Sequence, residues 1–189
     1  MNKDLLLSFV DRVVQIDRGG PESRVGKVLA VEEDHLVVLT ENDGVIYYNT
    51  HHIKSITNNA KQGFEFGLDI PENFNYLQAS KFKDILNGLR HRWVQINRGG
   101  PEKLEGVLEE VTNDYVVVVA GEAIVRVSTF HLRNISYGVR IEKGKAETDG
   151  NNTGNKNNKR NNSNQKTQKK EEKAEKSGEA KKVEEETND

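Results

Sequence analysis

The sequence has 189 residues, of which 34% are hydrophobic and 31% are charged, and it contains no cysteine. Residues 1–140 hold 16 Lys and Arg against 19 Asp and Glu, which is a net charge of −3, and residues 141–189 hold 12 against 11. The missing cysteines exclude disulfides, thiolate nucleophiles and sulfur-based metal sites. The missing positive excess argues against binding nucleic acid through its phosphates.

A short helix is expected first, over residues 3–10. Its apolar run at residues 5–10 lies between Asp4 and Asp11 and is shorter than the hydrophobic region of a signal peptide. No stretch of the sequence approaches the roughly 20 apolar residues of a membrane span. We therefore expect neither an export signal nor membrane insertion.

Short strands are expected after this helix. Residues 13–16 form a β-rich run that ends at a turn containing Gly and Pro, and further strand candidates follow at 26–31, 36–40, 45–48 and 53–56. Asn-Asp-Gly at 42–44 predicts a tight hairpin, because Gly tolerates the positive φ that such turns need.

The same pattern then occurs a second time. Arg-Val-Val-Gln-Ile-Asp-Arg-Gly-Gly-Pro-Glu at 12–22 recurs at 92–102 as Arg-Trp-Val-Gln-Ile-Asn-Arg-Gly-Gly-Pro-Glu, and 14 of the 30 positions from 11 to 40 are identical at an offset of 80. One residue is then deleted, so that His-Ile-Lys-Ser-Ile at 52–56 matches His-Leu-Arg-Asn-Ile at 131–135 at an offset of 79. An internal repeat of this kind decides the architecture.

The second copy also follows a helix candidate. Apolar residues recur there at helical spacing, at Phe74, Leu77, Phe82, Ile85, Leu86 and Leu89. The run Tyr-Val-Val-Val-Val at 115–119 predicts a strand buried on both faces, as in a small closed barrel. The fourth strand differs most between the copies, with Ile-Tyr-Tyr at 46–48 against Val-Arg-Val at 125–127.

These elements predict a mainly β protein with two tandem SH3-like or Sm-like small barrels, each preceded by a short helix. The first barrel module with its helix covers 1–57, a linker covers 58–71, and the second module covers 72–139. Residues 140–189 are rich in Asn, Lys and Glu and lack the apolar area that would offset the entropy of ordering, so a disordered tail is predicted. Modules this small have thin cores, and we expect the two copies to pack together or the chain to self-associate.

The Arg-Gly-Gly-Pro-Glu loops are the most distinctive candidates for a functional site. Gly-Gly permits backbone angles that a β-carbon forbids and Pro fixes the next φ, so at least one Gly is expected at positive φ. The loop is either a turn required between two strands or a recognition loop displayed twice. The candidate interaction residues are Arg18, Gly19, Gly20, Pro21, Glu22, Arg98, Gly99, Gly100, Pro101 and Glu102.

Secondary candidates follow the fourth strand of each copy. They are His52 and Lys54 in the first copy and His131 and Arg133 in the second. The histidines either pack beside the last strand or join a basic patch of the kind that an RNA-binding Sm-like protein uses. No set of three or four converging metal ligands, no nucleophile context and no phosphate loop is visible, so we expect no metal, no cofactor, no small-molecule substrate and no enzymatic activity.

The combined motif resembles the spore coat protein B family of endospore-forming bacteria. The matching residues are Val-Gln-Ile-Asp/Asn-Arg-Gly-Gly-Pro-Glu, then Gly26 or Gly106, Asp followed by His or Tyr, and His-Ile-Lys-Ser-Ile, over about residues 5–138. The resemblance implies a structural, non-enzymatic component of the spore coat, assembled from the mother-cell cytoplasm. The family's longer form has a further module and a Ser-rich tail that is phosphorylated, whereas residues 140–189 hold only Ser163 and Ser177.

These observations predict one function and leave one alternative open. The first is a structural component of the endospore coat that binds other coat proteins through its repeated modules, with self-association as a further expected contact. The alternative is an Sm-like RNA-binding protein, which would need a basic face lined by aromatic residues although the folded region is net acidic. Nucleic acid is therefore the less expected partner.

Overall fold

The computed structural model describes residues 1–141, and these belong to one compact unit. Ten antiparallel strands form a single sheet in the order β5-β1-β2-β3-β4-β10-β6-β7-β8-β9. The N-terminal half consists of α1 (Lys3–Leu7), β1 (Val13–Ile16), β2 (Arg24–Val31), β3 (His35–Thr40), β4 (Gly44–Asn49) and β5 (Ile56–Thr57). The C-terminal half consists of α2 (Phe82–Gly88), β6 (Trp93–Ile96), β7 (Leu104–Val111), β8 (Tyr115–Ala120), β9 (Ala123–Ser128), the 3₁₀ turn η1 (Thr129–His131) and β10 (Asn134–Ser136).

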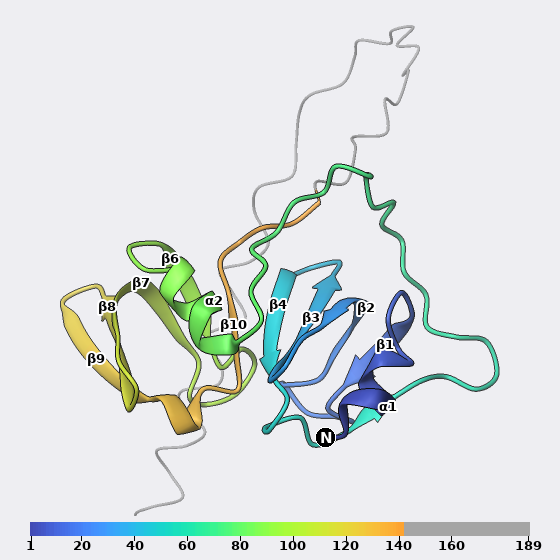
Figure 1. Ribbon diagram of the computed structural model, residues 1–189, viewed down its shortest axis with the longest axis horizontal. Coiled ribbons are helices and arrows are strands. Elements are labelled where there is room, and N and C mark those ends of the chain that lie inside the picture. The colour runs from blue at the N-terminus through green and yellow to red at the C-terminus, as the bar shows by residue number, and fades with distance from the viewer. Residues whose placement is uncertain (142–189) are drawn as a thin grey trace, which may run out of the picture. The chain divides into compact units, whose positions relative to one another are not determined.

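β10 joins the two halves. It pairs with β6 of its own half and with β4 of the other, so that Ile135 lies opposite Ile96 on one side and opposite Tyr47 on the other. Figure 1 shows this orange strand between the blue and the green-yellow strands. The predicted mainly β class is confirmed, but the strands form one continuous sheet, and two separate barrels are not confirmed.

Two clusters of apolar side chains make up the core. One lies inside the N-terminal half and contains Leu36 and Val38. The other contains Val37 and Leu39 together with α2 and the strands of the C-terminal half. Successive residues of a strand point to opposite faces, so β3 is buried at all six positions because each face meets a different cluster. Burial on both faces was predicted for the corresponding run at 115–119, where β8 is buried at its second to fourth residues and half-buried at the others.

The elements before β5 follow the sequence closely. β1 coincides with the predicted strand, and Gly44 has φ +71° in the predicted hairpin between β3 and β4. The first helix ends at Leu7, earlier than predicted, and turns replace it up to residue 10. The fifth strand is Ile56–Thr57, so it begins after most of the predicted segment 53–56.

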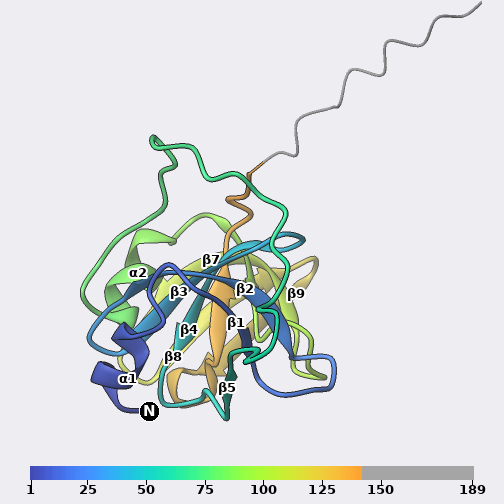
Figure 2. The same cartoon turned by 90° about the vertical axis from the view of Figure 1, so that its right-hand side faces the viewer.

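The second helix was predicted too long. It begins at Phe82, and Phe74 and Leu77 lie in the connector instead. The Leu77 amide donates to the Tyr137 hydroxyl at 3.0 Å, and its carbonyl accepts from the Tyr47 hydroxyl at 2.8 Å. Helical spacing of these residues thus reflects packing of an irregular segment on the core. Figure 2 shows this connector as a long loop outside the strands.

The predicted boundaries 1–57, 58–71 and 72–139 stay predictions, as does the barrel character of each half. The predicted disordered tail, residues 140–189, falls almost entirely outside the described residues.

Candidate functional site

The two Arg-Gly-Gly-Pro-Glu loops connect corresponding strands, β1 to β2 and β6 to β7. Gly20 has φ +72° and Gly99 has φ +83°, so the prediction of a left-handed Gly in the loop is confirmed. The residue before each motif is also left-handed, with φ +53° at both Asp17 and Asn97. Asp and Asn are the non-glycine residues that adopt this conformation most readily.

Asp17 and Asn97 fix their loops through the same contacts. The Asp17 carboxylate accepts from the Lys54 amide at 2.9 Å, and the Asn97 side-chain oxygen accepts from the Arg133 amide at 2.8 Å. Asn97 also donates from its side chain to the His131 carbonyl at 3.0 Å. These bonds tie each loop to the segment after the fourth strand of its half, which holds the secondary candidates.

The second loop lies against the first. A β-carbon at Gly99 would collide with the backbone carbonyl of Pro21, and one at Gly100 would lie 2.7 Å from Oε1 of Glu22. Gly99 is therefore needed both for its positive φ and for this close approach. The loops are neighbours, and the display of each one as a separate recognition loop stays a prediction.

An ionic network surrounds the contact between the loops. Asp43 accepts from Nε of Arg24 at 2.6 Å and from Nη1 of Arg98 at 2.5 Å, so one carboxylate joins the two halves. The Arg98 side chain is 14% exposed and the Asp43 side chain 19%. Arg98 also donates from Nε to the Ser136 hydroxyl at 2.8 Å, which fixes the guanidinium against β10.

Glu22 makes the second ionic link. It pairs with Arg133 of the C-terminal half and with Lys54 of its own half, the latter at 3.0 Å between Nζ and Oε2. The hydrogen bond from Arg133, followed by that from Lys54, lowers the pKa of Glu22 below its ordinary value. Two pairs of opposite charge, each contributed by both halves, therefore hold the loops together.

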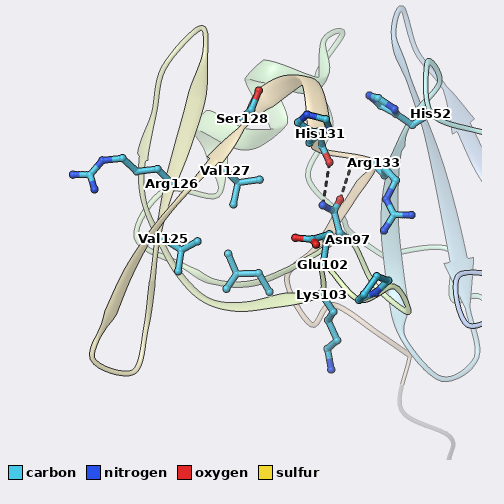
Figure 3. Close-up of a pocket in the computed structure, with 12 residues that line it drawn as sticks. His52, Asn97, Glu102, Lys103, Val125, Arg126, Val127, Ser128, His131 and Arg133 are labelled. Carbon is cyan, nitrogen blue, oxygen red and sulfur yellow. Dashed lines mark hydrogen bonds between the residues drawn. The ribbon is translucent and has the colours of Figure 1, made fainter.

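A pocket of about 640 Å³ opens between the second loop and β9. Figure 3 shows β9 on one side and the loop below, with Asn97 bonded to His131 and Arg133. Five predicted site residues line it, namely His52, Pro101, Glu102, His131 and Arg133. The remaining lining residues are Asn97, Lys103, Leu104, Val125, Arg126, Val127 and Ser128.

Several basic residues border the pocket, but they do not converge on it. Figure 3 shows the side chains of Arg126 and Lys103 pointing away from its centre. Arg133 is engaged by Glu22. His52 packs edge-on against Phe130, with 5.7 Å between ring centroids, and burial lowers the pKa of its imidazole, which favours the neutral form. The pocket thus has a mixed lining with a carboxylate, Glu102, among its polar groups.

The chain is similar to a curated protein, "Spore coat protein B" of Bacillus subtilis (strain 168), with 34% identity over 134 residues. The match covers 71% of this chain and 34% of the relative, so the chain spans about a third of the length of that protein. The match supports a spore coat protein B-like family. The family predicted from the motifs is therefore confirmed. No protein-family profile and no solved structure matches the chain.

The sequence of this spore coat protein B-like chain carries no pattern that marks Asp43, Arg126 or Asp34 as site residues. The Asp34 carboxylate accepts from the Phe82 amide at 2.7 Å at the start of α2. Opposite charges at 43 and 98 carry no local pattern, because the residues are 55 positions apart. In the sequence, the difference between Tyr47 and Arg126 indicates that the two fourth strands have different surroundings.

Within residues 1–141, no group of three or more His, Asp or Glu side chains is placed to hold a metal ion. No helix in the same part of the chain is long and apolar enough to cross a membrane.

Proposed function

We propose that this chain is a non-enzymatic structural component of the bacterial endospore coat, which it joins through protein–protein contacts of its two repeated halves. The similarity to Spore coat protein B over 71% of the chain carries the proposal. We take each half to be an SH3-like or Sm-like unit, and the two halves to share β10.

The surface of the C-terminal half supports a role in protein contacts. Trp93, Ile124 and Phe130 are 57%, 62% and 72% exposed. Ile124 lies on β9, an outermost strand of the sheet, and Phe130 follows in η1. Exposed apolar side chains beside a sheet edge are typical of surfaces that bind another protein.

Localisation in sporulating cells tests the proposal. A fluorescent fusion to the full chain is expected to be made in the mother-cell cytoplasm and to gather around the forespore. The protein should then be recovered from purified spores by coat extraction and be missing from vegetative cells. Fluorescence that stays diffuse throughout sporulation would contradict a role in the coat.

The alternative function, an Sm-like RNA-binding protein, needs a separate measurement. Tight RNA binding that weakens steeply with salt in a filter-binding assay would support it, because phosphate contacts release counterions. The engagement of Arg98 by Asp43 and of Arg133 by Glu22 leaves fewer cations for phosphate and favours the coat proposal.

A further inference from the structure

β5 and β9 are the outermost strands of the sheet. Among the residues that the structure describes, β5 pairs only with β1, and β9 pairs only with β8. The outward N–H and C=O groups of such edge strands can pair with the strand of another chain. Each end of the sheet can therefore accept one more strand.

The two halves are built with the same registers. Val28 lies opposite Val38 as Leu108 lies opposite Val118, and both pairs precede a bulge at the same place. The same holds for the other pairings within each half, at the sequence offsets of 80 and 79. β4 therefore corresponds to β9, and β5 corresponds to β10.

One strand pairing has no counterpart within the chain. β10 adds to β4, with Ile135 opposite Tyr47, and the corresponding pairing would add β5 to β9, with Ile56 opposite Arg126. β5 and β9 lie at opposite ends of the ten-stranded sheet, so two different molecules must form it. We propose that β5 of one copy adds to β9 of a second copy, in the register that β10 and β4 use within the chain.

The charges needed for this contact are present on both surfaces. The Arg98–Asp43 pair at the internal junction corresponds to Arg18 of one copy and Glu122 of the other. Both Arg18 and Glu122 are exposed, and neither has an ion pair within residues 1–141. The basic residue is Arg at both 98 and 18, and the acidic residue is Asp at 43 and Glu at 122.

Opposite charges correspond at a second position as well, where Lys54 pairs with Glu22 of its own half within the chain. Arg133 and Glu22 at the internal junction correspond to Lys54 of one copy and Glu102 of the other. Glu102 lines the pocket beside β9. In the N-terminal half, Arg133 lies against the corresponding Glu22. The pocket is therefore the place where Lys54 of the copy that supplies β5 would enter.

Apolar surface follows the same correspondence. Val45 of the N-terminal half and Ile85 of the C-terminal half belong to the same core cluster, and both are 0% exposed. The corresponding residues are Ile124 on β9 and Leu5 in α1, which are 62% and 50% exposed. A second copy docked in the proposed register brings Leu5 to the face of Ile124 and removes both side chains from water.

This contact is head-to-tail, so it repeats from copy to copy. It closes into a ring if the rotation per copy allows and otherwise extends as a filament. The inference deepens the proposed function by naming the partner of two surfaces, a second copy of the chain. It does not depend on which other coat proteins the chain meets.

A backbone variant on β9 tests the strand pairing. The amides of Val45 and Asn49 donate across the junction, to the carbonyls of Val139 and Arg133, so alternation places the Tyr47 N–H on the same side. The corresponding N–H belongs to Arg126. Arg126→Pro removes it without touching the ladder to β8, and Arg126→Ala keeps it as the matched control.

Sedimentation velocity on the full chain over a concentration series supplies the measurement. We expect the wild type and Arg126→Ala to form species larger than a monomer as concentration rises. Arg126→Pro should associate at least about tenfold more weakly, because one carbonyl of the incoming strand loses its donor. Unchanged association of Arg126→Pro would overturn the proposal, as would a wild type that stays monomeric at every concentration.

A charge-exchange experiment tests the direction of the contact. Arg18→Glu and Glu122→Arg should each weaken self-association, because each places like charges at the junction. Mixed together, the two variants should form a one-to-one complex through Glu at 18 and Arg at 122, and growth should stop there. Self-association that neither substitution weakens, as expected for symmetric β9–β9 pairing, would exclude the head-to-tail contact.

The outcomes separate this inference from the coat proposal. A chain that gathers at the forespore but stays monomeric in solution would contradict the inference alone. A chain that assembles in solution yet stays diffuse in sporulating cells would contradict the coat role alone.

Discussion

Single residues at the loop contact have roles that depend on their surroundings. Gly20 and Gly99 belong to the same motif and both have positive φ, but open space surrounds Gly20 and the Pro21 carbonyl faces Gly99. Glu22 is likewise engaged by two cations, whereas Glu102, at the same place in the second motif, is exposed. One motif therefore supplies both a loop at the internal junction and a loop whose Glu faces a pocket.

We expect Ala to be less tolerated at position 99 than at position 20. Gly20→Ala should lower the free energy of unfolding by about 1–2 kcal/mol, the cost of a left-handed L-residue. Gly99→Ala should lower it by at least about 1 kcal/mol more, because its β-carbon must displace the Pro21 backbone. Urea denaturation of both variants measures the difference, and equal losses would show that the loops are not in contact.

Stability should also depend on pH through Glu22. Its lowered pKa means that the folded state favours the carboxylate, so the contribution is present above the ordinary value of 4.5 and is lost as pH falls through the lowered pKa. Glu22→Gln should be less stable than the wild type at neutral pH, and the difference should shrink in acid. Arg133→Met removes the larger cause and should show the same convergence in urea denaturation. A pH-independent difference would contradict this assignment.

At the scale of elements, corresponding strands have different environments. β4 is buried at five of six positions, whereas every residue of β9 is exposed or half-buried. Tyr47 suits the first setting, because its hydroxyl finds the Leu77 carbonyl while its ring is buried, and Arg126 suits the second. Positions 47 and 126 thus hold different residue types because β10 pairs with β4, whereas β9 is an edge strand of the sheet.

Hydrogen exchange should report this difference directly. At low protein concentration, the amides of Val45 and Asn49 should exchange at least about tenfold more slowly than those of Ile124 and Ser128. The first pair donates to backbone carbonyls across the junction, at 2.8 and 2.9 Å. Nuclear magnetic resonance can follow the four amides. Equal protection at high dilution would contradict the internal pairing, and protection of Ser128 that grows with concentration is expected from self-assembly.

At the scale of the whole molecule, the two halves depend on each other. The larger core cluster draws residues from both, and β10 completes the sheet of the N-terminal half. Repeat proteins bury a continuous core by stacking units that cannot bury their own faces alone. Each module was predicted to have a small core, and the cluster that both halves share enlarges it.

Separation of the halves should be destabilising. A fragment of residues 1–71 uncovers Val45 and Tyr47, each of which contributes about 1.5–3 kcal/mol when fully buried. We expect this fragment to aggregate or to lose its cooperative urea transition, whereas residues 1–141 should unfold in one transition. A soluble 1–71 fragment with the same midpoint as residues 1–141 would show that the halves fold independently.

The sequence by itself determined the local pattern of this protein and its family. β1, the hairpin at Gly44 and the left-handed loop glycines depend on neighbouring residues. They were predicted from the β-rich run at 13–16, from Asn-Asp-Gly at 42–44 and from the Gly-Gly pair of the loop. The similarity to Spore coat protein B extends over 71% of the chain.

Only the tertiary structure decided how the halves are joined. The pairing of β10 with β4, the contact between the loops and the Asp43–Arg98 ion pair all involve residues distant along the chain. Two similar modules can pack in many ways with the same local pattern, because strand propensity and turn chemistry do not specify which edge meets which. Packing selected one junction and left its counterpart exposed on β5 and β9.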